Sequence, residues 1–328
     1  RRHCGSTGHF FRKGVTTLQK TKQKDPALRL RSGRPGAWKY LIVLIPILAF
    51  WFVLHIYPNI AIFGTAFYKW SGLSDAKKFV GWQNFKVAFR SEQWFKKCFF
   101  NTSVYIIYSV ILQTILAMAL ALALRKNTRF NNAMRTLYFI PVVLSSVAVS
   151  LIWVYMYDVN IGFFHNLFKV LGLQHLADFQ YLSGRYQWLF FIAVVQIWAG
   201  IGIPITLFTA GFQSISEDIY EAASLDGANG WQTFWHVTLP QMMPTVLRVM
   251  MLTISGAAIA FDYVLMLGVE HVEASASFDT WAVTIYKSMV GSSNYGMVAA
   301  NSTLLAIFLM IICIIQYVAT KRAEDSFL

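Results

Sequence analysis

Residues Ser214–Pro240, SISEDIYEAASLDGANGWQTFWHVTLP, form the one polar break in a long apolar part of the chain. The break contains no Lys or Arg, and neither cation occurs anywhere between Arg185 and Arg248. Its four acids are Glu217, Asp218, Glu221 and Asp226. A cytoplasmic loop between two membrane spans normally collects basic residues. An acidic loop with this much internal pattern therefore indicates a specific role.

The composition around this loop predicts an all-α, polytopic membrane protein. Of the 328 residues, 56% are hydrophobic and 13% are charged, whereas soluble domains are about one-quarter charged. A spanning helix needs about 20 apolar residues. Six stretches reach that length: Tyr40–Phe67, Phe99–Leu124, Leu137–Tyr157, Trp188–Phe212, Met243–Leu267 and Val298–Thr320. We therefore expect six transmembrane helices.

The distribution of charge predicts the orientation of these spans. The net charge is +13, and residues 1–38 hold ten Lys or Arg against one acid, so +9 of it lies in this N-terminal tail. A basic tail in front of a first span places that end in the cytoplasm and favours contact with anionic lipid. We expect a transmembrane domain over residues 39–328 with both termini cytoplasmic. Charge confined to one tail does not indicate nucleic-acid binding.

The first outer loop breaks the positive-inside rule in the other direction. Between Lys69 and Lys97 the chain has seven Lys or Arg and only two acids, Asp75 and Glu92. One explanation is a set of interfacial anchors around a short amphipathic helix. The alternative is attraction of an acidic partner or an anionic substrate.

The acidic loop itself predicts a helix, a sharp turn and a second helix. Ser214 and Glu217 have capping-box spacing, and Glu217 and Asp218 occupy a first turn whose dipole favours acids. Gly227 suits the left-handed residue that ends a helix. Four residues share one shallow face by helical spacing: Ile219, Ala222, Ala223 and Asp226.

The second helix of the loop is expected to begin after Asn229, which is a favoured N-cap residue. Trp231, Phe234 and Val237 form its apolar stripe, and Leu239-Pro240 is expected to stop it. Such a hairpin between two spans has the shape of a docking element.

The loop resembles the cytoplasmic signature of permease subunits of ABC importers: EAA, three residues, Gly, nine residues, a β-branched apolar residue, one residue and LP. The extended form, from Tyr220 through Ala228 with Thr238-Leu-Pro240, is similar to the carbohydrate branch, although Val237 replaces the commoner isoleucine. The resemblance continues through Phe79-Val80-Gly81, Asn84-Phe85 and Asn101-Thr102, and through Pro141–Trp153 with Gly162 and Asn166.

The resemblance implies the fold of a type I importer permease with a coupling helix seated in a separate ATPase subunit. It assigns that contact to Glu221, Ala222, Ala223, Asp226, Gly227, Leu239 and Pro240. It also implies a second, similar permease, two ATPase subunits, an extracytoplasmic solute-binding protein and a bacterial inner membrane. The basic tail and the end at Leu328, which lacks a Gly-rich segment, resemble the first permease of a heterodimer.

The chain is not expected to bind ATP or to catalyse a reaction. No GxxxxGK[ST] loop occurs, and indeed no Gly-Lys pair, so ATP with Mg²⁺ is expected on the partner ATPase subunits. No HExxH or GxSxG motif indicates a membrane-embedded enzyme. Cys4, Cys98 and Cys313 are isolated and indicate neither a metal site nor a disulfide. We expect no cofactor in this chain.

Ionisable residues inside the predicted spans are sparse: His55, Arg248 and Asp262. A proton-coupled transporter typically has chains of such groups, so this sparse set favours energy supplied from outside the membrane. An ion-coupled secondary transporter of a small polar solute is the alternative hypothesis. A saccharide path needs aromatic faces and hydrogen-bonding groups. Candidates, for which core packing or an interfacial belt is the other explanation, are Trp153, Trp198, Phe261, Asp262, Tyr263 and Asn301.

The cargo is expected to be an oligosaccharide. The basic outer loop would attract an anionic one, such as an oligouronide or alginate fragment, and a neutral one is the alternative. The segment Gly268–Ser277 departs from the Gly/Pro-rich loop of the resembled family, so contacts there do not transfer.

Overall fold

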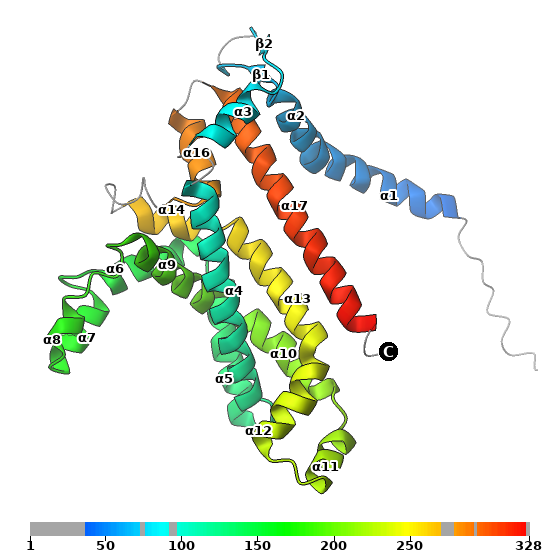
Figure 1. Cartoon of the computed structure of the whole chain (residues 1–328), viewed down its shortest axis with the longest axis vertical. Coiled ribbons are helices and arrows are strands. Elements are labelled where there is room, and N and C mark those ends of the chain that lie inside the picture. Colours follow the sequence, from blue (N-terminus) through cyan, green and yellow to red (C-terminus); the bar gives the residue numbers. More distant parts are fainter. Residues whose placement is uncertain (1–36, 73–75, 92–96, 270–278, 292–293, 326–328) are drawn as a thin grey trace, which may run out of the picture. The chain divides into compact units, whose positions relative to one another are not determined.

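A computed structural model describes residues 37–72, 76–91, 97–269, 279–291 and 294–325, and Figure 1 shows that helices dominate them. The basic tail, residues 1–38, lies outside the described residues except for its last two. The chain divides into two compact units, Arg1–Ile56 and Tyr57–Leu328. In the first unit, α1 (Ala37–Trp51) contains Pro46 and continues into the π-helical turn η1 (Phe52–Ile56).

The second unit carries the remaining elements. It begins with α2 (Tyr57–Thr65), β1 (Tyr68–Lys69), β2 (Lys78–Phe79), α3 (Gln83–Arg90), α4 (Cys98–Ala123), α5 (Arg129–Phe139), η3 (Ile140–Val143), α6 (Ser146–Tyr157), α7 (Phe163–Val170) and α8 (Gln174–Ala177). It continues with α9 (Arg185–Gly200), α10 (Gly202–Ser214), α11 (Glu217–Leu225), α12 (Gly230–Thr233), η4 (Phe234–Thr238), α13 (Leu239–Ala258), α14 (Asp262–Val269), α16 (Trp281–Gly291) and α17 (Tyr295–Asp325). The two short strands pair antiparallel, with Tyr68 opposite Phe79.

Within the described residues, four helices are long and apolar enough to cross a membrane: Leu44–Thr65, Cys98–Ala123, Gly230–Ala258 and Tyr295–Arg322. Two bent pairs bring the number to six if each pair is one span: Arg129–Val143 with Ser146–Tyr157, and Tyr186–Gly200 with Gly202–Ser214. The all-α, multi-pass class predicted from composition is confirmed.

Two predicted spans are broken helices. The stretch predicted as the span Leu137–Tyr157 bends by 102°, so it is not one continuous helix. Pro141 sits in the 3-10 turn η3, and Leu144 is extended with ψ 147°, so a new helix must start at Ser146. The stretch predicted as Trp188–Phe212 bends by 59° at Ile201, between Gly200 and Gly202.

The fifth predicted span, Met243–Leu267, is displaced along the chain. Its helix starts in the acidic loop and ends at Ala258, and α14 begins separately at Asp262. The bounds were wrong because the apolar run continues across a break in the backbone at residues 259–261, which hydropathy does not detect.

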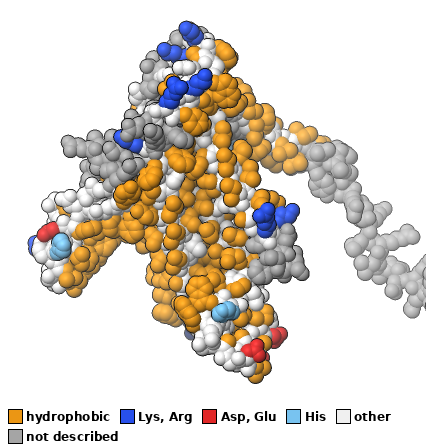
Figure 2. Space-filling view, in the orientation of Figure 1, with side chains coloured by type: hydrophobic (Ala, Val, Ile, Leu, Met, Phe, Trp, Pro, Cys, Tyr) orange, Lys and Arg blue, Asp and Glu red, His pale blue; other side chains and the backbone are white. Residues whose placement is uncertain are grey.

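Helix α4 is the central packing element, because α9, α10 and α13 all contact it, and α13 also contacts α17 (Figure 1). Trp188, Tyr105 and Phe208 are among the largest fully buried side chains. Ile107, Ile111 and Ile115 of α4, spaced by four, are more than half exposed. An apolar face that no other described part of the chain covers suits contact with lipid. Figure 2 shows hydrophobic side chains over much of the visible helical surface.

Candidate functional site: the coupling loop

The first helix of the acidic loop, α11, starts one step away from the predicted cap. Ser216 is the N-cap, and its hydroxyl accepts a hydrogen bond from the Asp218 amide at 3.3 Å. The predicted Ser214–Glu217 capping box is wrong, because Ser214 still belongs to α10 and donates to the Gly211 carbonyl at 2.7 Å. Ile215 is extended, with ψ 123°, and separates the two helices.

The end of α11 is the predicted glycine turn. Gly227 has a φ of +76°, the left-handed conformation that residues with a Cβ rarely adopt. Its amide donates to the Ser224 carbonyl at 3.1 Å, and the Ala228 amide donates to the Ala223 carbonyl at 3.0 Å. These two bonds are the pair that defines a Schellman motif. They satisfy carbonyls at the helix end while the chain reverses direction.

The second helix begins as predicted and ends differently. The Asn229 side chain accepts from the Gln232 amide, the Gln232 side chain accepts from the Asn229 amide, and both distances are 2.9 Å. Leu239-Pro240 does not stop this helix, contrary to prediction. The π-helical turn η4 leads directly into α13, where Pro240 occupies the first turn. A proline at the start of a helical segment loses no intrahelical hydrogen bond there.

The tip of the hairpin is both acidic and apolar at its surface. Glu221, Ala222 and Asp226 are exposed, but Ala223 is 8% exposed and faces the chain itself, so the predicted shallow face is split. Leu225 is 89% exposed and Trp231 is 71% exposed. Within the described part of the chain, Glu221 has no ion-pair partner. Figure 2 shows acidic side chains gathered at this end of the molecule.

A cleft of about 640 Å³ separates α11 from the basic loop that follows α4. Arg125 and Lys126 line one side, and Glu217 and Glu221 line the other. The Arg125 guanidinium lies 5.7 Å from the centre of the Tyr220 ring, and the Tyr220 hydroxyl accepts from the Thr238 hydroxyl at 3.5 Å. The basic loop thus packs against the acidic helix α11 through the contact between Arg125 and Tyr220. Sequence reasoning missed this pairing, although the opposite charges of the two loops were a usable signal.

The predicted substrate-path residues fall into three places. Trp153 is buried and meets the half-exposed Trp198 edge-to-face, with ring centres 5.7 Å apart. Both line an apolar cavity of about 630 Å³ against α4 and η3. Asn301 is fully buried elsewhere in α17 and donates to the Met297 carbonyl at 3.0 Å.

Phe261, Asp262 and Tyr263 line a different cavity, of about 350 Å³, at the break between α13 and α14. The Asp262 carboxylate accepts a hydrogen bond from the Ser146 hydroxyl of α6. Gln196 of α9 also lines this cavity, and its side-chain oxygen accepts from the Tyr105 hydroxyl. Sequence reasoning missed Gln196, although it is the only side-chain amide between Trp188 and Phe212.

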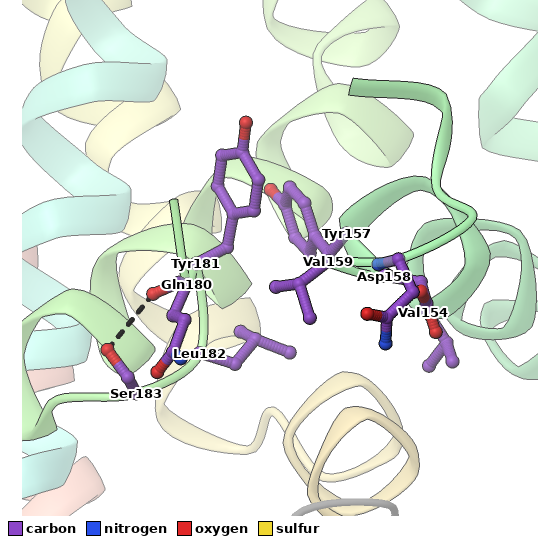
Figure 3. A pocket seen from close by; sticks show the side chains of 9 residues that line it. Val154, Tyr157, Asp158, Val159, Gln180, Tyr181, Leu182 and Ser183 are labelled. Carbon is purple, nitrogen blue, oxygen red and sulfur yellow. Dashed lines mark hydrogen bonds between the residues drawn. The ribbon is translucent and has the colours of Figure 1, made fainter. Parts of the chain in front are cut away.

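A further pocket, of about 430 Å³, lies between the end of α6 and the segment before α9 (Figure 3). The stacked rings of Tyr157 and Tyr181, 4.9 Å apart, form its apolar part, and Asp158, Gln180 and Ser183 supply polar groups. Burial raises the pKa of the Tyr181 hydroxyl above its ordinary value. This pocket was not predicted from the sequence.

Comparisons with known proteins identify the family. Residues 113–325 match the model of the family described as "Binding-protein-dependent transport system inner membrane component". The multiple sugar-binding transport system permease protein MsmF of Streptococcus mutans is 29% identical over 295 residues, covering 88% of this chain and 96% of that protein. The trehalose/maltose transport system permease protein MalF of Thermococcus litoralis is 27% identical over 300 residues, covering 91% and 97%.

A solved structure supports the fold. A chain of a bacterial ABC transporter involved in the import of the acidic polysaccharide alginate superposes with a TM-score of 0.74 at 21% identity, covering 87% of this chain and 96% of that one. The family match favours an importer permease over an ion-coupled transporter. The chain is a multi-pass membrane protein that belongs to the family of inner membrane components of binding-protein-dependent transport systems.

Proposed function

We propose that this chain is the permease subunit of an ATP-driven carbohydrate importer and that the hairpin of α11 and α12 docks into an ATPase subunit. The observation that carries the proposal is the hairpin tip, where the exposed Glu221 and Leu225 stand beside the left-handed Gly227. An acid without an ion-pair partner in the described chain, next to a large exposed apolar residue, suits a protein interface.

The proposed assembly contains a second, similar permease, two ATPase subunits that bind ATP with Mg²⁺, and a solute-binding protein that delivers the cargo. Both termini of this chain lie in the cytoplasm of a bacterial cell. Closure of the ATPase dimer moves the docked hairpin, and the spans change between inward- and outward-facing states. The continuous helix from Gly230 to Ala258 supports this role, because it joins the docking surface to the membrane interior without an intervening loop.

The proposed cargo is an oligosaccharide, because the relatives with similar sequences are named for sugars and their oligomers. Aromatic rings with hydrogen-bonding neighbours, as around Phe261 and Gln196, suit the faces and hydroxyls of a sugar. An anionic oligouronide is the finer proposal. The cations of the β1–β2 hairpin and the structural likeness to an importer of an acidic polysaccharide support it.

The test is reconstitution with the cognate ATPase and solute-binding protein. Glu221→Lys and Gly227→Pro should abolish substrate-stimulated ATP hydrolysis, while Asp178→Lys, a charge reversal outside the hairpin, should leave it intact. Full coupling in the two hairpin variants would rule out the proposed docking. A binding panel of neutral and uronic oligosaccharides on the solute-binding protein then decides the cargo separately.

A further inference from the structure

Helix α3 is fixed where two candidate spans end. The Asn84 side chain donates to the carbonyl of Ala66, just past α2, at 2.7 Å and to that of Tyr68 at 2.9 Å. The Tyr295 amide, at the start of α17, donates to the Trp70 carbonyl at 2.8 Å. Phe85 of α3 is buried against the same elements. Since the ends of spanning helices lie at the membrane–water boundary, α3 lies at the depth of the lipid headgroups.

The opposite face of α3 is aromatic and basic. Trp82 is 63% exposed and Phe89 is 50% exposed. Lys86, between them in the sequence, and Arg90, next to Phe89, are also exposed. These four side chains, with the edge of Phe85, line a groove of about 390 Å³. Figure 2 shows Lys and Arg gathered at this end of the molecule.

The exposed aromatic ring is held in place rather than free to turn inward. The Trp82 ring packs against Phe67 and Phe85, with ring centres 5.2 Å away in each case. Trp side chains held at this level are typical of membrane interfaces, where an apolar body and a polar N–H are both accommodated. The groove is therefore a preformed feature of the folded chain.

Within the described residues, neither Lys86 nor Arg90 forms an ion pair, and the two acids of this loop, Asp75 and Glu92, lie outside those residues. Residues 57–72 and 76–91 include no Asp or Glu. Lys86 and Arg90 are four residues apart on one helix, a spacing at which like charges repel. An anion between the two cations removes that repulsion, and the positive-inside rule gives no other reason for cations here.

We propose that α3 binds the headgroup phosphate of an anionic phospholipid. Lys86 and Arg90 contact the phosphate, and the rings of Trp82 and Phe89 lie against the upper part of the acyl chains. Basic residues beside apolar rings on a short amphipathic helix are the pattern of interfacial lipid contact. The proposal concerns the lipid surroundings of the transporter and is independent of its cargo.

The test uses the full-length chain in its assembled transporter, reconstituted into vesicles of phosphatidylcholine with either photoactivatable phosphatidylglycerol or photoactivatable phosphatidylcholine. After irradiation, mass spectrometry measures lipid attached to the peptide that carries α3. We expect phosphatidylglycerol to label it preferentially. Each of Lys86→Gln and Arg90→Gln should lower that preference about fivefold, since one basic residue at an anionic surface contributes roughly that factor. Lys169→Gln, an exposed lysine on α7, should not change it.

Three results would overturn the proposal. Equal labelling of α3 by both lipids would show that the groove does not select an anionic headgroup. An unchanged preference in Lys86→Gln and Arg90→Gln would show that these cations do not bind it. Absence of labelling of α3 by either lipid would show that the groove does not face the bilayer. An unchanged thermal transition in each variant verifies that these exposed substitutions leave the fold intact.

Discussion

The backbone amide of Ala228 donates to the carbonyl of Ala223 at 3.0 Å, across the left-handed Gly227. This bond turns the chain from α11 into α12 and leaves Leu225 projecting from the tip. Apart from its two chain neighbours, no heavy atom of the described residues lies within 4 Å of the position that a Cβ of Gly227 would take. The glycine is therefore required by the backbone conformation and not by lack of space.

Gly227→Ala should weaken docking without unfolding the protein. A residue with a Cβ costs about 1–2 kcal/mol in the left-handed conformation, and the added Cβ would meet no neighbouring side chain, so the change stays local. We expect roughly fivefold or greater loss in affinity for the ATPase subunit, measured by titration in lipid nanodiscs. Gly230→Ala is the matched control, because its Cβ would also meet no atom and its φ is not in the left-handed region. An equal loss of affinity for the ATPase subunit in both variants would show that the left-handed turn at Gly227 does not support docking.

Gly202→Ala should damage the junction between the two broken spans. Its Cβ would lie 2.7 Å from the Tyr138 carbonyl oxygen and 2.9 Å from the Phe139 Cα. Overpacking of this kind costs about 1–3 kcal/mol, so we expect a lower thermal transition in detergent at a fixed scan rate. Gly200→Ala, whose Cβ would meet only the Gln113 side chain at 3.8 Å, should leave the transition unchanged. A harmless Gly202→Ala would contradict the observed proximity.

Asn84→Ala should detach the β1–β2 hairpin from α2. The side chain is 4% exposed, and its loss leaves the carbonyls of Ala66 and Tyr68 without their donor. Buried polar groups left unsatisfied cost about 1–3 kcal/mol each. Thermal unfolding and proteolysis near residue 68 should both report the change. The neighbouring exposed Gln83→Ala provides the comparison, and similar stability of the two variants would argue against the anchor.

Lys287→Gln should destabilise the protein increasingly as pH rises. Burial raises the pKa of the Asp279 carboxyl above its ordinary 3.8, and the Lys287 ammonium, 2.8 Å away, opposes that rise. A carboxyl whose folded pKa exceeds its unfolded pKa reduces stability once pH exceeds the unfolded value. Without Lys287 the pKa of Asp279 in the folded protein rises further. The loss of stability therefore grows over a wider pH range above the unfolded pKa.

The expected deficit of Lys287→Gln near neutral pH is about 1–2 kcal/mol, a modest figure because the lysine side chain is 40% exposed. Below both pKa values the carboxyl is neutral in folded and unfolded protein, and the deficit should shrink. Thermal unfolding from acidic to neutral pH measures this, with Lys169→Gln as the control lysine. A deficit that is independent of pH would show that the ion pair is not its source.

Much of the fold follows from local features of the sequence. The apolar runs are long enough to span a membrane, and their length predicted the helices α4 and α17 to within a few residues. Asn229 and Gly227 act through hydrogen bonds to residues three to five positions away. A cap and a turn of that kind are visible in a short window of sequence.

The predictions were wrong where two nearby residues, or two local structures, fit the same short stretch of sequence equally well. Ser214 and Ser216 both precede acids, and only the backbone path after α10 selects Ser216 as the cap. Leu239-Pro240 has the composition of a helix end, yet the π-helical turn before it lets the helix continue into α13. Hydropathy also treats a bent or interrupted helix as one span, because bending does not change composition.

The sequence alone determined the membrane class, the capped hairpin with its glycine turn, and the position of that hairpin between two apolar runs. Only the tertiary structure brought Arg125 against Tyr220, Gln196 beside Asp262, and α3 onto the end of α2. The physical reason is range. Capping, turns and hydropathy depend on residues close in the chain, whereas clefts, braces and lipid-facing grooves depend on the packing of side chains far apart in sequence.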